Sequence, residues 1–243
     1  MGVRLRPRLP FRFVMQRRRI VRVLLVLAIV VAFFVLRRPR SASLPLETIT
    51  DGPPPSQATA ILVFLHGRGV TIDREKPIID RLRRAGLSAT VTIVLLEGPF
   101  PSGLGRGWGD SAEEQADSRA RIAARLDALL GDSGLSPSHV VIAGFSQGAG
   151  LAIDVAASDK RIGGLASFSP CLSMLRGELP KRDDLRILLA HGSNDRRCPV
   201  EESRSLARAL EAANKKPRYI ELEGDHTIPS EVLQALVTLV EQF

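Results

Sequence analysis

The sequence predicts an α/β protein with a mainly parallel β-sheet and helices on both faces of the sheet. From residue 58 to the end, short apolar runs alternate with segments whose apolar residues recur at helical spacing, which is the pattern of repeated βα units. One apolar run, which starts at residue 140, passes through a Gly-x-Ser-x-Gly turn into a segment that can form a helix. The roughly 186 residues from 58 to 243 are enough to bury one sizeable core.

The first forty residues differ from everything that follows. They contain eleven arginines and no acidic residue. Residues 23–36 form an unbroken apolar run, and the stretch 20–36 spans roughly 25 Å as a helix. Because a hydrocarbon core is about 30 Å thick, Arg22 must extend its charge to the interface. We therefore expect a transmembrane anchor or a signal segment at about residues 20–36.

The arginines also predict the orientation of this leader, residues 1–40. Seven of them precede Ile20 and three follow Leu36, which places the N-terminus in the cytoplasm and the rest of the chain on the extracytoplasmic side, in a bacterium the periplasm or cell surface. Ser41-Ala42-Ser43 has the small residues of a cleavage site, so an anchor and a cleaved signal both remain open. The alternative is a cytoplasmic protein with a misassigned start codon.

Residues 41–57 include three consecutive prolines and are expected to be a stiff linker before the domain at 58–243. The whole chain carries a formal charge of +8 and its eleven leader arginines carry +11, so the remainder is mildly acidic. The basic balance belongs to the leader and does not indicate nucleic-acid binding.

The elements of the domain follow in order from the apolar pattern. Pro77 in the first turn and Gly86 after the last favour one helix, and Ser111 with Glu114 forms a capping box that begins another. A Gly/Pro loop covers residues 98–109. The predicted strands are residues 61–65, 90–96, a run that starts at 140, 165–168, 187–190 and 219–222. The predicted helices are residues 77–85, a helix that starts at 111, 151–157, 200–214 and 232–243. Only residues 169–185 leave room for an insertion, so no large lid is expected.

The turn at residues 144–148 is typical of a nucleophile elbow. A strained turn between a strand and a helix leaves little room for a Cβ, which explains Gly144 and Gly148. Ser146 is then exposed at the strand tip, and the backbone N–H of Gln147 points at the same place as one donor of an oxyanion hole. Ser146 is therefore the candidate nucleophile.

A serine nucleophile needs a base and a group that orients the base. At sites built on this elbow, the acid and then the histidine follow the serine. Only His191 and His226 follow Ser146, and only His226 leaves room for an acid before it. Asp195 lies just beyond the predicted strand 187–190, where open α/β sheets place their sites. Asp225 adjoins His226 and is the weaker candidate acid, and His191 is expected to support the acid loop.

Four motif blocks lie in order along roughly residues 58–243. They read Phe64-Leu65-His66-Gly67-Arg68-Gly69, Gly144-Phe145-Ser146-Gln147-Gly148-Ala149, His191-Gly192-Ser193-Asn194-Asp195 and Gly224-Asp225-His226. They resemble the phospholipase/carboxylesterase family of α/β-hydrolases, which includes the acyl-protein thioesterases and small bacterial carboxylesterases. The resemblance implies an α/β-hydrolase fold and a Ser146–His226–Asp195 triad. It also implies an oxyanion hole from the N–H groups of Gln147 and Arg68, and a carboxylic ester hydrolase that needs no cofactor.

The expected substrate is a small ester, because a rim without a lid suits soluble or short-chain substrates. Trp108, the only tryptophan, lies in the glycine-rich loop, where it either walls the acyl or alcohol pocket or covers the core. Arg68 and Arg106 either favour an anionic substrate group or are solvated. No spacing of His, Cys or Asp suggests a metal site.

The two cysteines, Cys171 and Cys198, both follow predicted strands on the same rim. In an oxidising compartment they can form a disulfide. The alternative is two small, partly buried thiols, because sequence does not reveal whether their Cα atoms lie within about 7 Å.

The favoured function is a short-chain carboxylesterase that acts through an acyl-serine intermediate. The alternatives are a lysophospholipase, an acyl-thioesterase or peptidase with the same triad, and a catalytically silent anchored binding module. The intact Ser146, Asp195 and His226 argue against the silent module, because a decayed site usually lacks at least one such residue. The oligomeric state stays open.

Overall fold

The computed structural model describes residues 45–131, 133–172 and 179–243. The predicted anchor or signal segment at residues 20–36 therefore lies outside the described residues. Within the described ranges, no helix combines the length and the apolar character needed to cross a bilayer.

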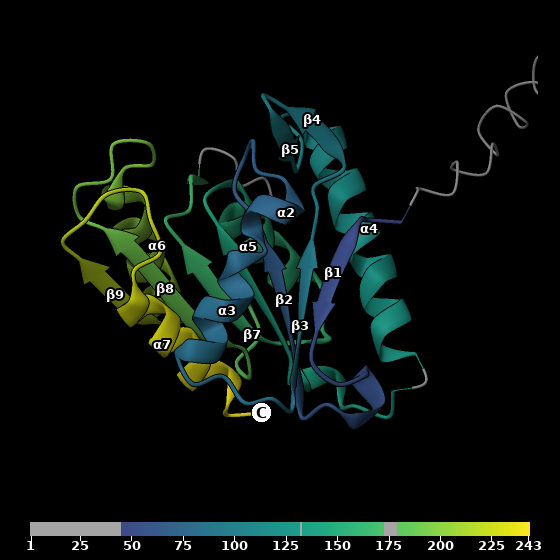
Figure 1. Ribbon diagram of the computed structural model, residues 1–243. Coiled ribbons are helices and arrows are strands. Elements are labelled where there is room, and N and C mark those ends of the chain that lie inside the picture. Colours follow the sequence, from purple (N-terminus) through teal and green to yellow (C-terminus); the bar gives the residue numbers. More distant parts are fainter. Residues whose placement is uncertain (1–44, 132, 173–178) are drawn as a thin grey trace, which may run out of the picture. The chain divides into compact units, whose positions relative to one another are not determined.

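A seven-stranded sheet forms the centre of the domain, in the order β1-β3-β2-β6-β7-β8-β9 (Figure 1). Its strands are β1 (Thr48–Asp51), β2 (Ala60–Leu65), β3 (Val91–Leu96), β6 (Val140–Phe145), β7 (Ile162–Phe168), β8 (Arg186–Gly192) and β9 (Arg218–Leu222). Neighbouring strands are parallel except β1 and β3, which are antiparallel. The prediction of a mainly parallel sheet is confirmed, and parallel strands place their carboxyl ends at one edge.

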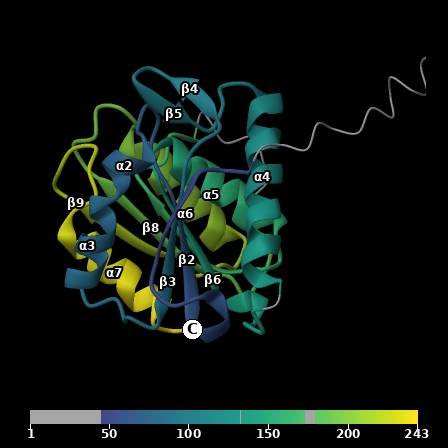
Figure 2. The same ribbon diagram turned by 45° about the vertical axis from the view of Figure 1, so that its right-hand side comes forward.

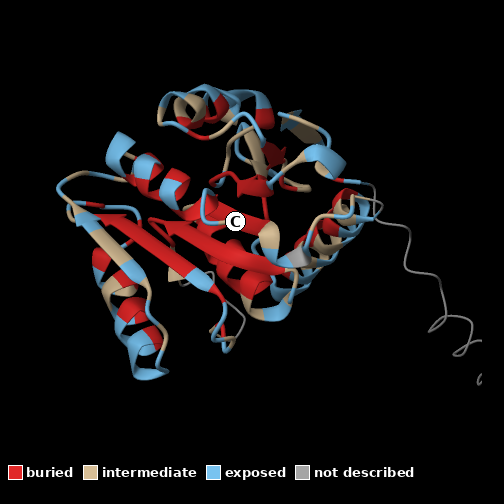
Figure 3. Ribbon diagram, turned by 90° about the horizontal axis from the view of Figure 1, so that it is seen from below, coloured by how far each residue is buried: buried red, intermediate tan, exposed pale blue. Residues whose placement is uncertain are grey.

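Helices cover both faces of this sheet, as predicted. Apolar side chains of α4, α5 and α6 pack against one set of strand residues, and those of α2, α3 and α7 against the alternate set. Figure 2 shows α4 running along one side of the sheet, and Figure 3 shows the buried residues gathered in the central strands and on the helix faces toward them. The helices are α2 (Ile72–Glu75), α3 (Pro77–Arg84), α4 (Ala112–Leu130), α5 (Gln147–Ser158), α6 (Val200–Ala212) and α7 (Ser230–Val240), with 3-10 turns η1 (Pro55–Gln57) and η2 (Pro137–His139).

Residues 45–57 belong to the domain, so the predicted linker at 41–57 is wrong over this part. β1 pairs along its whole length with β3, and Leu46 lies in the core. The carbonyl of Pro53 accepts a hydrogen bond of 2.6 Å from Thr92 Oγ1. The proline-rich composition suggests a tether, but prolines also suit the turn after an edge strand, where no ladder partner needs their N–H.

The predicted loop at 98–109 contains a small hairpin of β4 (Phe100–Ser102) and β5 (Gly105–Gly107). The hairpin projects beyond the ends of β2 and β3 (Figure 1). Gly69 N–H donates to Arg106 O at 2.8 Å, and Arg106 N–H donates to Val70 O at 3.1 Å. These bonds attach the hairpin to the loop that follows β2.

Candidate active site

Ser146 occupies a strained turn between β6 and α5. Its φ is 56° and its ψ is −116°, a backbone conformation that L-residues rarely adopt. The Ser146 N–H donates to Phe168 O of the neighbouring strand β7 at 2.9 Å, which fixes the turn at the end of the sheet. The predicted strand, sharp turn and helix are all present.

The two glycines of the elbow are required by close backbone contacts. A Cβ on Gly144 would lie 2.3 Å from Gly148 O, and one on Gly148 would lie 2.3 Å from Leu65 O and 2.5 Å from His66 O. These atoms belong to the backbone and cannot move without shifting β2 or α5. The Gly-x-Ser-x-Gly pattern therefore follows from packing of the strand and the helix at the elbow.

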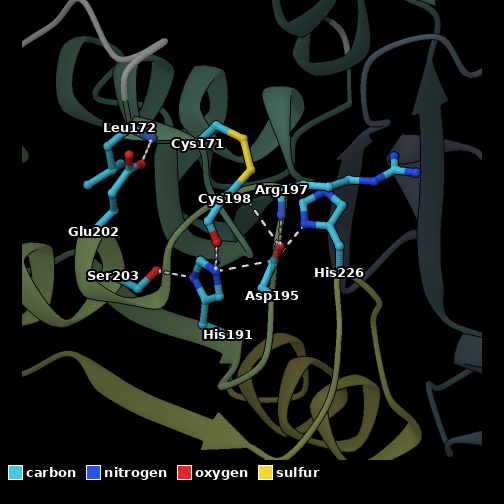
Figure 4. The surroundings of a disulfide bond; sticks show 9 residues. All are labelled: Cys171, Leu172, His191, Asp195, Arg197, Cys198, Glu202, Ser203 and His226. Atoms are coloured by element: carbon cyan, nitrogen blue, oxygen red, sulfur yellow. Dashed lines mark hydrogen bonds and ion pairs between the residues drawn. A yellow bond between two sulfur atoms is a disulfide. The ribbon is translucent and has the colours of Figure 1, made fainter.

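The structure brings together the predicted acid and the predicted base. Asp195 follows β8 and His226 follows β9, and His226 Nδ1 lies 2.6 Å from Asp195 Oδ2 (Figure 4). The side chain of Asp195 is fully buried, and that of His226 is 9% exposed. Asp195, rather than the alternative Asp225, therefore contacts the Nδ1 side of the ring.

Phe145 and Gly67 join this pair to the elbow. Phe145 immediately precedes Ser146 in the sequence. The centroid of its ring lies 4.6 Å from the centroid of the His226 ring. A Cβ on Gly67 would be 3.4 Å from the Cβ of Ser146, so the loop after β2 flanks the serine. Ser146, His226 and the loop after β2 thus share one site at the carboxyl edge of the sheet.

The Asp195 carboxylate is held in its charged form. Its Oδ1 accepts the N–H groups of Arg197 at 2.8 Å and Cys198 at 3.0 Å. Burial raises the pKa of Asp195, but the bonds from Cys198, His226 and Arg197 outweigh burial, so this pKa lies below its usual value of 3.8. An ionised Asp195 accepts the Nδ1–H of His226, which leaves the lone pair on Nε2.

His191 supports the acid loop, as predicted. Its Nε2 lies 2.9 Å from Cys198 O and 3.3 Å from Asp195 Oδ2, and its Nδ1 lies 2.6 Å from Ser203 Oγ (Figure 4). Since a carbonyl oxygen only accepts, Nε2 carries the proton, and in the neutral ring Nδ1 accepts the hydroxyl of Ser203. His191 therefore links α6 to both the acid and its turn.

His66 fixes the loop after β2 through both nitrogens of its ring. Gly98 N–H donates to its Nε2 at 2.9 Å, so the proton lies on Nδ1, which donates to Gly67 O at 2.7 Å. Burial lowers the pKa of His66 below its usual 6.5, although the bond to Gly67 opposes this. A neutral His66 therefore fixes the backbone beside Ser146.

Trp108 covers the core, which is the second of its two predicted places, and it does not form an exposed pocket wall. Its ring is fully buried, and Nε1 donates to His66 O at 2.8 Å. An indole N–H needs an acceptor when it is buried, and the carbonyl of His66 provides one beneath the loop after β2. Trp108 thus supports that loop and does not face solvent.

The two arginines of this region make polar contacts within the protein. The Arg68 guanidinium pairs with Asp110. That of Arg106 donates to Gly98 O at 3.1 Å and Pro99 O at 2.6 Å. The Arg106 side chain thus fastens the hairpin, and the oxyanion role of the Arg68 N–H stays a prediction.

Two side chains that fix the site were not among those predicted to do so. Gln147 is expected to act through its N–H, yet its side-chain amide also accepts Trp108 N–H at 3.0 Å and donates to Gly109 O at 3.0 Å. Ser203, on the buried face of α6, bonds His191. A polar residue at a core position of a helix signals a buried partner, and that signal is present for Ser203. Among the described residues, no group of three His, Cys, Asp or Glu side chains is arranged to hold a metal ion.

The elbow and the parallel sheet define a serine hydrolase with the α/β-hydrolase fold. The family model described as Phospholipase/Carboxylesterase matches residues 106–242, more than half of the sequence. The chain therefore belongs to this family of carboxylic ester hydrolases, as the motif blocks implied.

Solved structures share the fold at low sequence identity. Esterase PE8 superposes with a TM-score of 0.68 at 21% identity, covering 82% of this chain and 99% of that chain. The Bacillus cereus carboxylesterase gives 0.68 at 15% identity, with 87% and 98% covered. Arabidopsis thaliana SOBER1 gives 0.63 at 21% identity, with 75% and 98% covered. No curated protein matches the sequence significantly.

Proposed function

We propose that this chain hydrolyses short-chain carboxylic esters through an acyl-serine intermediate on Ser146. The observation that carries the proposal is the 2.6 Å contact between His226 Nδ1 and Asp195 Oδ2. This contact lies beside the elbow, where Ser146 has a φ of 56°. A buried carboxylate–histidine pair next to a strained serine is typical of a site built for chemistry.

In the proposed mechanism, Ser146 Oγ attacks the ester carbonyl while His226 Nε2 takes the serine proton. Asp195 accepts the Nδ1–H of His226, which selects the reactive tautomer and stabilises the imidazolium that forms. His226 then gives the proton to the departing alkoxide. A water molecule, activated by the same nitrogen, hydrolyses the acyl-serine.

The proposed oxyanion donors are the backbone N–H groups of Gln147 and Arg68. Gln147 begins α5, and the first N–H groups of a helix have no intrahelical acceptor. The positive end of the helix dipole favours negative charge at the same place. Because the Gln147 side chain is bonded to the backbone of Trp108 and Gly109, the donor is held in position before the oxyanion forms.

The short-chain preference is supported by the connection between β7 and β8, which spans only residues 169–185 and is too short for a large lid. It is also supported by Trp108, which lies in the core and adds no exposed apolar wall for a long acyl chain. A separate argument, from leaving-group chemistry, supports esters over amides. An alkoxide departs with modest help, whereas an amine must be protonated and its amide held rigidly.

The test is a panel of chromogenic esters of increasing chain length, beside matched anilides, thioesters and lysophospholipids. We expect kcat/KM for acyl chains of about two to six carbons to exceed that for anilides by at least ~100-fold, or about 2.7 kcal/mol. A preference for anilides, or for chains beyond about ten carbons, would overturn the assignment. A preference for thioesters would move the activity to the thioesterase alternative.

We also propose that residues 20–36 anchor or export the domain to the extracytoplasmic side. The arginine excess before Ile20 supports this orientation, and a disulfide between Cys171 and Cys198 suits an oxidising compartment. Residues 1–44 fused to alkaline phosphatase should give active enzyme in a bacterial host. A fluorescent protein that folds only in the cytoplasm should stay dark in the same fusion, and the opposite pattern would refute export.

A further inference from the structure

A disulfide joins the acid turn, residues 195–198, to the segment after β7, residues 169–172. Cys198 lies three residues beyond Asp195, and Cys171 follows β7 (Figure 4). Their Cα atoms are 4.9 Å apart across a sequence separation of 27. Cys198 is 1% exposed, and Cys171 is half-buried.

The backbone N–H and the carbonyl of Cys198 both help to position Asp195. Its N–H donates to Asp195 Oδ1 at 3.0 Å, and its carbonyl accepts His191 Nε2 at 2.9 Å. His191 Nε2 also lies 3.3 Å from Asp195 Oδ2. The position of Cys198 therefore affects both oxygens of the carboxylate, one directly and one through His191.

The Cys171 end of the bond lies beside the elbow. The β7 strand that leads to it ends at Phe168, whose carbonyl accepts the Ser146 N–H at 2.9 Å. The carbonyl of Cys171 is 3.6 Å from the position of a Cβ on Gly150 in α5, the helix that follows Ser146. The disulfide thus connects the turn that carries the acid to a segment packed against the nucleophile helix.

A second contact anchors this segment to α6. The N–H of Leu172, next to Cys171, donates to the carboxylate of Glu202 (Figure 4). Glu202 is adjacent to Ser203, the residue that bonds His191. Residues 169–172 are therefore bonded to α6, and the disulfide holds Cys198 to these residues.

We propose that the Cys171–Cys198 disulfide is a positioning element that orients the Asp195 carboxylate toward His226. The inference rests on the proposed function, because it assigns a role in the reaction to the support of Asp195. Reduction takes two electrons and two protons from a dithiol reductant, breaks the S–S bond and leaves two thiols, while the reductant becomes a disulfide. The acid turn then loses its covalent link to Cys171 and to the segment packed against α5.

The charge of Asp195 supports this role. Burial raises its pKa, but the hydrogen bonds from Cys198, His226 and Arg197 hold the pKa below its usual value. Moving Cys198 therefore weakens one of the contacts that keep the buried carboxylate ionised. The effect is expected at the chemical step, where the acid acts, and not in ground-state binding of the ester.

The experiment measures ester hydrolysis by the oxidised enzyme, the same enzyme reduced with dithiothreitol, and the C171S/C198S variant. Thiol counting verifies two thiols after reduction, and circular dichroism verifies the fold at the assay temperature. We expect kcat to fall about tenfold in the reduced enzyme and in the variant, with KM changed less than about twofold. The variant treated with dithiothreitol is the matched control and should show no further change.

A second series repeats the cysteine substitutions in an Asp195→Asn background. If the disulfide acts through Asp195, they should cost less than about twofold there. An unchanged kcat after verified reduction, or a loss of about tenfold that persists in the Asp195→Asn background, would overturn the inference. Unfolding of the reduced enzyme would also overturn it, because the bond would then support the fold as a whole. Failure of the proposed function is separate, because it appears as turnover that survives Ser146→Ala.

Discussion

Asp195 presents Oδ2 to His226 Nδ1 at 2.6 Å while its other oxygen is already engaged. Oδ1 accepts the N–H groups of Arg197 and Cys198 at 2.8 and 3.0 Å. The two oxygens thus have different partners, and the carboxylate cannot rotate by half a turn without exchanging them. This arrangement determines what an amide would do in its place.

Asp195→Asn should lower kcat by about 10³–10⁴-fold without unfolding the protein. The two backbone N–H groups require an oxygen at the Oδ1 position, so the amide nitrogen of the new side chain faces His226. It would donate to Nδ1, place the ring proton on Nε2 and remove the base that Ser146 needs.

The measurement is kcat with a short-chain chromogenic ester, with the thermal midpoint as a control for the fold. A loss of less than about tenfold, with the fold intact, would show that Asp195 does not orient the base.

Much of the fold can be predicted because strands buried on both faces are continuous apolar runs. β2 and β3 are buried throughout and are evident in the sequence. β1, Thr48–Asp51, is an edge strand with half-exposed residues and follows no such pattern, so the sequence alone predicts a linker there. Short edge strands depend on pairing with a neighbour, which local sequence does not encode.

The chain order of serine, acid and histidine, with the position of Asp195 just beyond a predicted strand, is enough to predict the contact between Asp195 and His226. The orientation of Trp108 is not predictable in this way, because it depends on a tertiary acceptor, the carbonyl of His66. The disulfide is not predictable either, since the 4.9 Å between the Cα atoms of Cys171 and Cys198 results from how β7 and β8 pair. Both depend on contacts between segments far apart in the chain.

Gly148→Ala should lower kcat by at least about 100-fold and destabilise the fold by about 2–3 kcal/mol. The new Cβ would lie 2.3 Å from Leu65 O and 2.5 Å from His66 O, so α5 or the loop after β2 must shift. Gly224→Ala is the matched control, because a Cβ there meets no atom within 4 Å. Equal activity of the two variants in an ester assay would argue against the packing account of the elbow.

The stability of the domain should decrease as pH falls below about 6.5 in a way that depends on His66. Burial lowers the pKa of His66 in the folded state, while the unfolded state keeps a value near 6.5. Below that pH the unfolded chain binds the proton first, so the free energy of unfolding falls as pH decreases, by at most about 1.4 kcal/mol per pH unit for one proton.

His66→Gln removes this titration and keeps an acceptor for the Gly98 N–H. Urea unfolding of both proteins between about pH 7.5 and 5 checks the expectation. The difference in unfolding free energy between wild type and variant should shrink toward low pH, and a difference that stays constant would show that His66 does not titrate with unfolding.

The assignment of Ser146 as the nucleophile and His226 as its base is tested most directly by kcat of Ser146→Ala with a short-chain ester. Because the members of such a site act as a unit, Ser146→Ala and His226→Ala should each lower kcat by about 10⁴-fold or more, and the double variant should lose little beyond either. If purified, folded Ser146→Ala retained more than about a tenth of wild-type turnover, the assignment of the elbow as the catalytic site would be wrong.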